Sequence, residues 1–152
     1  MGAFKVDCEL QELTGIQPPV SIAGVMVDTG SEYTWLPEKL LAQAGIGVRK
    51  KDLAFVMANG TRITRDVGYA FLRSSGFETV DEVVFARPGD LRLLGARTIE
   101  GFAALVDARR KRLVASGPLP VAAGPGRSSR SRTPGLARAR AAARSTLRRA
   151  AR

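Results

Sequence analysis

Apolar and polar residues alternate near the start of the chain, where charged residues separate Phe4, Val6, Cys8 and Leu10. A period of two is typical of a β-strand with one buried face. The run VSIAGVMV at 20–27 predicts a second strand, and the sequence TGIQPP between the two predicts a turn. Because Cys8 falls on the apolar face, we interpret it as a core residue and not as a reactive thiol.

A short helix is predicted within TWLPEKLLAQAGI at 34–46. Pro37 suits the first helical position, and Gly45 suits the C-terminal stop. Further on, Asn59 and Gly60 lie between two apolar-polar runs, LAFVM and TRITRDVGYAFLR. Both residues tolerate positive φ, so this pair predicts the tip of a β-hairpin.

The second arm of this hairpin also alternates, with Val67, Tyr69 and Phe71 on one face. We interpret Tyr69, Phe71 and the single tryptophan, Trp35, as core residues. The remaining pattern predicts a strand at 78–86, a turn at 87–90, a strand at 91–95, a helix at 96–107 and a strand at 110–116. About seven short strands and two short helices indicate a mainly β, barrel-like domain.

The positive charge of the chain is concentrated at its C-terminal end. Residues 1–117 contain 15 Lys and Arg against 14 Asp and Glu, whereas residues 118–152 contain nine Arg and no acidic residue. This end is rich in Pro, Gly, Ser and Ala and lacks aromatic residues, so it cannot bury a core. We therefore expect a folded domain at 1–116 and a disordered basic tail at 117–152. The tail favours weak, salt-dependent contact with nucleic acid, without aromatic side chains for base stacking.

The composition excludes several kinds of site. The chain has no histidine, which removes Ser-His-Asp and Cys-His catalysis, and its single cysteine makes a zinc site improbable. We expect neither a metal nor a cofactor. No apolar run reaches 18 residues, and the N-terminus lacks the layout of a secretory signal. These features, together with the lone cysteine, predict a cytoplasmic protein that does not cross a membrane.

The strongest candidate for chemistry is Asp28, which directly follows the apolar run VMV and precedes Thr29 and Gly30. Asp, Thr and Gly are common turn residues, so a purely structural turn is the alternative interpretation. Three features of the context favour chemistry: the carboxylate ends an apolar strand, a hairpin tip follows about thirty residues later, and LRLLG then leads into a predicted helix.

The segments VDTGSEYTWLP, MANGTRI and LLGARTIEGFAALVD, taken together, resemble the retropepsin-like aspartic proteases. The resemblance covers about residues 4–115. It implies an acid-protease β-barrel with aspartic endopeptidase activity on peptides or proteins, and Asp28 as the catalytic residue. Two adjacent carboxyls share one proton, so one activates water while the other protonates the peptide carbonyl. The chain has no second turn of this kind, so the partner carboxyl would be Asp28 of a second copy in a symmetric homodimer.

The resemblance also assigns roles to the residues that follow Asp28. Thr29 would form a hydrogen bond across the dimer, and Gly30 would let the backbone turn and approach the substrate. Ser31 would lower the pKa of the carboxyl pair if its hydroxyl reached Asp28, and we expect an acidic optimum. Glu32 would bind the substrate backbone.

Two further segments belong to the same expected substrate site. The hairpin tip would form a flap that closes over a bound peptide and excludes water; its residues are Met57, Ala58, Asn59, Gly60 and Thr61. Leu93 and Leu94 would pack beside the catalytic turn and line the substrate cleft. Two other functions remain open: a catalytically weak dimerisation or peptide-binding module of the same fold, and a nucleic-acid-associated protein that acts through its tail.

Overall fold

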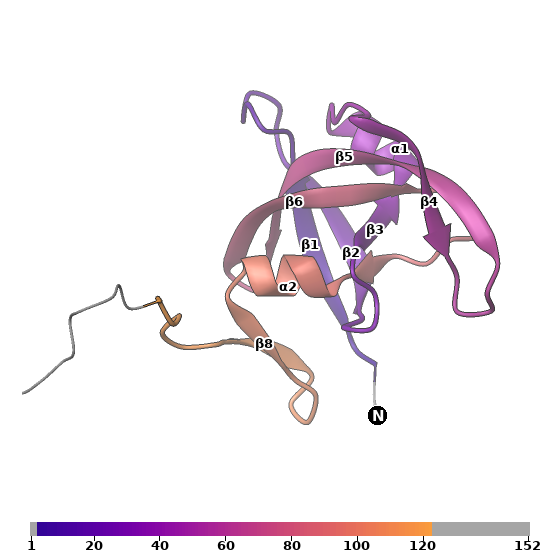
Figure 1. Ribbon diagram of the computed structural model, residues 1–152. Coiled ribbons are helices and arrows are strands. Elements are labelled where there is room, and N and C mark those ends of the chain that lie inside the picture. Colours follow the sequence, from indigo (N-terminus) through magenta and orange to yellow (C-terminus); the bar gives the residue numbers. More distant parts are fainter. Residues whose placement is uncertain (1–2, 123–152) are drawn as a thin grey trace, which may run out of the picture. The chain divides into compact units, whose positions relative to one another are not determined.

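The computed structural model describes residues 3–122 of the chain (Figure 1). The chain divides into two units, Met1–Leu119 and Pro120–Arg152, and the elements below belong to the first. They are β1 (Lys5–Gln11), β2 (Val20–Val27), β3 (Thr34–Pro37), α1 (Glu38–Gln43), β4 (Lys50–Val56), β5 (Arg62–Ser74), β6 (Phe77–Ala86), β7 (Leu93–Leu94), α2 (Ala96–Gly101), β8 (Ala104–Asp107) and β9 (Arg112–Ala115). Within the described part, no helix is long and apolar enough to cross a membrane. Most of the predicted tail, with its expected disorder and nucleic-acid contact, lies outside the described residues.

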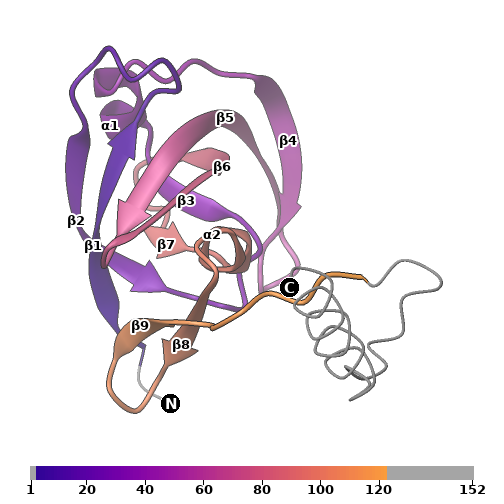
Figure 2. The same cartoon turned by 90° about the vertical axis from the view of Figure 1, so that its left-hand side faces the viewer.

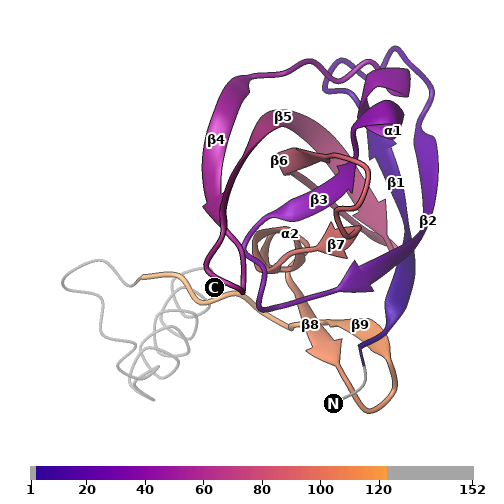
Figure 3. The same cartoon turned by 90° about the vertical axis from the view of Figure 1, so that its right-hand side faces the viewer.

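Seven strands form one sheet that closes on itself. Their order is β1-β2-β7-β3-β6-β5-β4, and β1 also pairs with β5, so β4 lies outside the ring that this pairing completes. The pairs β2–β7 and β3–β6 are parallel, and the other pairs are antiparallel. Figures 2 and 3 show the long strands β5 and β6 curving around the ring. The expected mainly β barrel with two short helices is confirmed.

The core fills this ring mainly from alternate strand positions, with one shift in β2 at Gly24, whose φ is 67°. In β2, the side chains of Ile22, Val25 and Val27 are buried, and in β1 those of Cys8 and Leu10 are buried. Burial raises the pKa of the Cys8 thiol to about 11. The thiol therefore stays protonated near neutral pH, as expected of a core cysteine.

The segment 34–37 is a strand and not the start of a helix. Thr34, Trp35 and Leu36 are all buried, and the segment pairs in parallel with β6. A continuous apolar run buried on both faces suits a parallel strand, and the prediction missed this because Pro37 suggested a helix start. The helix α1 begins one residue later, at Glu38, with Pro37 as its N-cap.

The predicted helix at 96–107 is two elements. The helix α2 ends at Gly101, and after Ala103, which has φ of 52°, the chain continues as β8. β8 pairs with β9, the predicted closing strand, in a separate hairpin. The helical spacing of Ile99 and Phe102 is real, since both are buried, but the helical pattern ends there.

Two of the three aromatic residues interpreted as core are only half-buried. In β5, Ala70 and Leu72 are buried in the main core, whereas Tyr69 and Phe71 point to the opposite face. Of the three residues predicted on that face, only Val67 is buried, against Trp35. Alternation fixes a period but does not say which of the two faces meets the core. Trp35 is buried, with 8% of its surface exposed.

Candidate active site

Asp28 lies at the end of β2, where that strand runs parallel to β7. Its backbone N–H donates to the carbonyl oxygen of Leu94 at 3.0 Å, which ties the turn to β7. The N–H of Gly30 donates to the Asp28 Oδ1 at 2.9 Å, and the N–H of Ser31 donates to the Asp28 carbonyl at 3.2 Å. The half-buried carboxylate is therefore held by its own turn. A Cβ at Gly30 would lie 3.1 Å from Oδ1, so glycine matters here for this close approach.

The hydroxyl of Ser31 does not follow the expectation for it. It donates to the carbonyl oxygen of Tyr33 at 2.9 Å, and not to Asp28. Because a hydroxyl has one proton to donate, Ser31 does not stabilise the ionised carboxylate in this chain. The reason given for an acidic optimum is thus absent from this geometry.

The backbone at Gly95 packs closely against the backbone that follows the Asp28 turn. Gly95 lies against the chain at 32–33, and a Cβ there would overlap the carbonyl oxygen of Tyr33 and lie 2.8 Å from that of Glu32. The N–H of Ala96 donates to the Ser31 carbonyl at 2.7 Å, and the N–H of Arg97 donates to the Glu32 carbonyl at 3.2 Å. Only glycine allows this spacing. The start of α2 is therefore held directly against the backbone of Ser31 and Glu32, at the end of the Asp28 turn.

A chain of buried hydroxyl groups continues this support into β6. The Gly95 N–H donates to the Thr34 hydroxyl at 2.9 Å, and Thr34 and Thr98 share a hydrogen bond of 2.6 Å. The Thr98 hydroxyl donates to the Asp81 Oδ2 at 2.9 Å. Because the Thr98 hydroxyl donates its one proton to Asp81, the Thr34 hydroxyl must be the donor in its hydrogen bond with Thr98. Both threonines are 0% exposed, and hydrogen bonds aligned in this way strengthen one another.

Replacing Thr34 by valine should destabilise the protein although the shape is kept. In the variant, the buried Gly95 N–H loses its acceptor and the Thr98 hydroxyl oxygen loses its donor. We therefore expect the free energy of unfolding to fall by about 1–3 kcal/mol. Denaturant unfolding followed by Trp35 fluorescence measures the change. Thr64→Val, an exposed position on β5, is the matched control, and should stay within about 0.5 kcal/mol of the unmodified protein. Equal stability of the two variants would contradict the hydroxyl chain.

Asp28 faces a cleft of about 570 Å³ between the catalytic turn, β4 and the loop before β7. Aromatic side chains form one wall: the ring centres of Tyr33 and Phe55 are 5.4 Å apart, and those of Trp35 and Phe55 are 4.9 Å apart. The cleft is lined by Asp28, Gly30, Ser31, Glu32, Tyr33, Trp35, Leu53, Ala54, Phe55, Val56, Met57, Ala58, Asp90, Leu91 and Leu93. A space of this size and largely apolar lining suits a peptide segment.

The structure brings seven of the twelve predicted site residues to this cleft. They are Asp28, Gly30, Ser31, Glu32, Met57, Ala58 and Leu93. Leu94 is fully buried in the core, so its expected role in lining the cleft is wrong. Thr29 is exposed and is not part of the cleft lining.

The expected flap is the turn between β4 and β5, which projects from the body of the domain in Figure 1. The Met57 N–H donates to the Thr61 carbonyl at 2.8 Å, and the Gly60 N–H donates to the Met57 carbonyl at 2.8 Å. Only Gly60, with φ of 82°, uses the positive φ that was expected of both tip residues. Asn59 instead accepts the Thr61 N–H on its side-chain oxygen at 3.0 Å. Asn59 and Gly60 are not part of the cleft lining.

Sequence reasoning missed the aromatic wall and Asp90. Tyr33 directly follows the catalytic turn and was assigned no role, whereas Trp35 was interpreted only as core. The aromatic content of the segment EYTW was the available signal. Asp90 gave no signal, because RPGD is an ordinary turn sequence.

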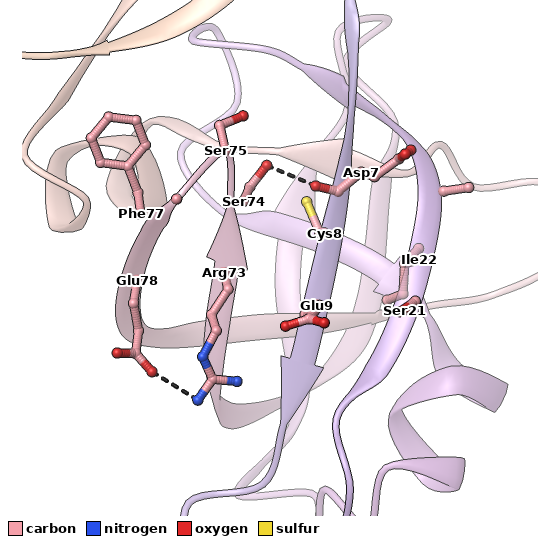
Figure 4. A pocket seen from close by; sticks show the side chains of 12 residues that line it. Asp7, Cys8, Glu9, Ser21, Ile22, Arg73, Ser74, Ser75, Phe77 and Glu78 are labelled. Carbon is pink, nitrogen blue, oxygen red and sulfur yellow. Dashed lines mark hydrogen bonds and ion pairs between the residues drawn. The ribbon is translucent and has the colours of Figure 1, made fainter.

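A second cavity, of about 610 Å³, lies between β1 and the turn joining β5 to β6 (Figure 4). It is slightly larger than the Asp28 cleft, but several of its polar groups are already paired. The Ser74 hydroxyl donates to the Asp7 carbonyl at 2.8 Å, and Arg73 forms an ion pair with Glu78 at 2.8 Å. Its one nucleophile, Cys8, stays protonated, so volume alone does not make this cavity the better candidate.

Two comparisons with known proteins found a match. A family model described as "Aspartyl protease" matches residues 18–98, which is more than half of the chain. The chain is also similar to a solved structure described as "Solution structure of Simian Foamy Virus (mac) protease", with 20% sequence identity and a TM-score of 0.43. That match covers 63% of this chain and 91% of that chain. A search of curated proteins found no match.

Proposed function

Because this chain belongs to the aspartyl protease family, we propose that it is an endopeptidase that works as a homodimer with one Asp28 from each subunit. The resemblance recognised from the three sequence motifs is confirmed at the level of the family. The observation that carries the proposal is the setting of Asp28: a half-buried carboxylate, fixed by its own turn, at the floor of a peptide-sized cleft.

The proposed mechanism needs two carboxyls in contact, and the cleft is lined by two besides Asp28, those of Glu32 and Asp90. Glu32 is exposed, and we assign it to the substrate backbone and not to the carboxyl pair. Asp90 also lines the cleft, but three N–H groups occupy its two oxygens, so it cannot share a proton with Asp28. A twofold axis beside the exposed Thr29 would bring two copies of Asp28 together. Thr29 would then stiffen the paired turns by a hydrogen bond between subunits.

Catalysis would proceed by acid and base steps at the Asp28 pair. The ionised carboxyl takes a proton from water as the water oxygen attacks the peptide carbonyl carbon, while the protonated carboxyl donates its proton to the carbonyl oxygen. When the tetrahedral intermediate collapses, the C–N bond breaks and a carboxyl protonates the leaving amine. The exposed Glu32 would accept hydrogen bonds from substrate N–H groups, and Met57 and Ala58 would cover the bound peptide. We expect this chemistry in the cytoplasm.

A peptide-library digest over a range of protein concentrations and pH values tests the proposal. Below the dimer dissociation constant the rate per subunit should rise with protein concentration, in step with the dimer fraction from sedimentation. We also expect an acidic optimum, because the pair must keep one proton. Cleavage by a strict monomer would reject the shared site. Peptide binding by a dimer without cleavage would favour the alternative of a binding module.

A further inference from the structure

A partly buried ion pair lies at the edge of the Asp28 cleft, on groups that the proposed reaction does not use. The Arg65 guanidinium meets the Asp90 carboxylate with two hydrogen bonds, Nε to Oδ2 at 2.7 Å and Nη2 to Oδ1 at 2.9 Å. The Arg87 N–H also donates to the Asp90 Oδ2 at 2.8 Å, and the Arg65 Nη1 donates to the Thr64 carbonyl at 2.8 Å. The two-pronged contact fixes direction as well as distance between the two segments.

The pair differs from the other ion pairs of the described residues in its burial. The side chains of Arg65 and Asp90 are 13% and 11% exposed, whereas every other pair has at least one side chain that is more than 30% exposed. The hydrogen-bonded guanidinium also lowers the pKa of the Asp90 carboxyl below its ordinary value. Exposed pairs contribute little, but removing one partner of a pair that is largely shielded from solvent leaves a charge with less compensation.

Asp90 lines the cleft, and Arg65, which is not part of the lining, lies beside one of the lining residues. Arg65 lies in β5, directly across from Leu53 of β4. Leu53 lines the cleft and lies two residues before Phe55 of the aromatic wall, on the strand that leads to the flap. Asp90 ends the turn at 87–90 and precedes Leu91, which also lines the cleft. No backbone hydrogen bond links the β4–β5 hairpin to this turn among the described residues, so the side-chain pair is their main polar link.

We propose that Arg65 and Asp90 form a positioning pair that holds the flap hairpin against the loop 87–92 and thereby sets the width of the substrate cleft. The inference rests on the proposed function for its kinetic consequence, but not for its structural one. Neither residue takes part in the bond-breaking steps. Loss of the pair lets the flap hairpin and the loop 87–92 move apart. This weakens peptide binding more than it slows the chemical step at Asp28.

Asp90→Asn tests the pair, because the amide keeps the shape and removes the charge. With the best-cleaved library peptide, KM should rise about 5- to 20-fold while kcat changes by less than about 2-fold. Backbone amides at 53–60 and 87–92 should exchange hydrogen at least about 10-fold faster. Arg65→Lys keeps the positive charge but cannot make the two parallel hydrogen bonds to Asp90, so it should show a smaller change of the same kind. This variant replaces Asp90→Asn in the test if Asp90→Asn does not fold.

Glu78→Gln is the matched control, because it also turns a carboxylate into an amide opposite an arginine of β5. That pair is exposed and lies at the second cavity, so exchange at 53–60 and 87–92 and both kinetic constants should stay unchanged. Unchanged exchange in Asp90→Asn and Arg65→Lys, or a loss confined to kcat, would overturn the proposal. If the unmodified protein cleaves nothing, the proposed function fails by itself, and the exchange comparison still decides whether the pair holds the cleft.

Discussion

Asp28→Asn should abolish peptide cleavage and leave the fold intact. An amide neither takes a proton from water nor returns one to the leaving amine, so kcat should fall by a factor of about 10³ or more. The fold should survive, because the contact that Oδ1 makes is an accepted hydrogen bond from the Gly30 N–H, which an amide oxygen also accepts. Product formation by mass spectrometry and thermal unfolding measure the two halves of this expectation.

The matched control for this variant is Asp66→Asn. Its Oδ1 accepts the Asp52 N–H at 3.0 Å, a contact of the same kind, and it does not line the cleft. It should cleave at the normal rate. Full activity in Asp28→Asn would remove Asp28 from the mechanism, and an equal loss in both variants would point to a general effect of removing a carboxylate.

Mixing the two forms separates a shared site from one carried by a single chain. If each site needs one Asp28 from each subunit, excess Asp28→Asn protein should capture unmodified chains in inactive mixed dimers. Activity per unmodified chain should then fall toward zero as the excess grows. Activity that depends only on the amount of unmodified protein would show that one chain is sufficient.

The parts of the fold that the sequence predicted well are those with a local cause. The strand at 20–27 was placed at its true ends because its apolar residues stop at Asp28 and a polar turn precedes it. The hairpin at Asn59–Gly60 was placed correctly because a glycine with positive φ is a local requirement. Asp28 stood out for the same reason, as a carboxylate directly after an apolar strand.

The parts that were missed have causes that are distant in the chain. Thr34–Pro37 becomes a strand because β6 and β7 lie beside it, about fifty residues later in the chain. Asp90 joins the cleft through Arg65, which lies 25 residues away. Leu93 and Leu94 are identical in type, yet one lines the cleft and the other is in the core, because a strand alternates its faces. No local pattern reports which neighbour a side chain will meet.

Gly95 is a position whose importance comes wholly from such a distant contact. Its φ is −87°, which every residue tolerates, so backbone strain gives no reason for glycine here. The reason is space: an added Cβ would overlap the Tyr33 carbonyl oxygen and lie 2.5 Å from the Tyr33 carbonyl carbon. Both atoms belong to the backbone of the segment that follows the catalytic turn, so no side chain can rotate away to make room.

Gly95→Ala should therefore destabilise the protein by about 3 kcal/mol or more, at the upper end for an overpacked position. The clash also pushes on the hydrogen bonds that join Ala96 to Ser31 and Arg97 to Glu32, so cleavage by the remaining folded protein should fall as well. Denaturant unfolding and the cleavage assay measure both effects. Gly47→Ala is the control, since a Cβ there meets nothing within 4 Å at a φ outside the positive region, and it should change stability by less than about 1 kcal/mol. If the two alanine variants were equally stable, the backbone crossing at Gly95 would not be what holds the catalytic turn in place.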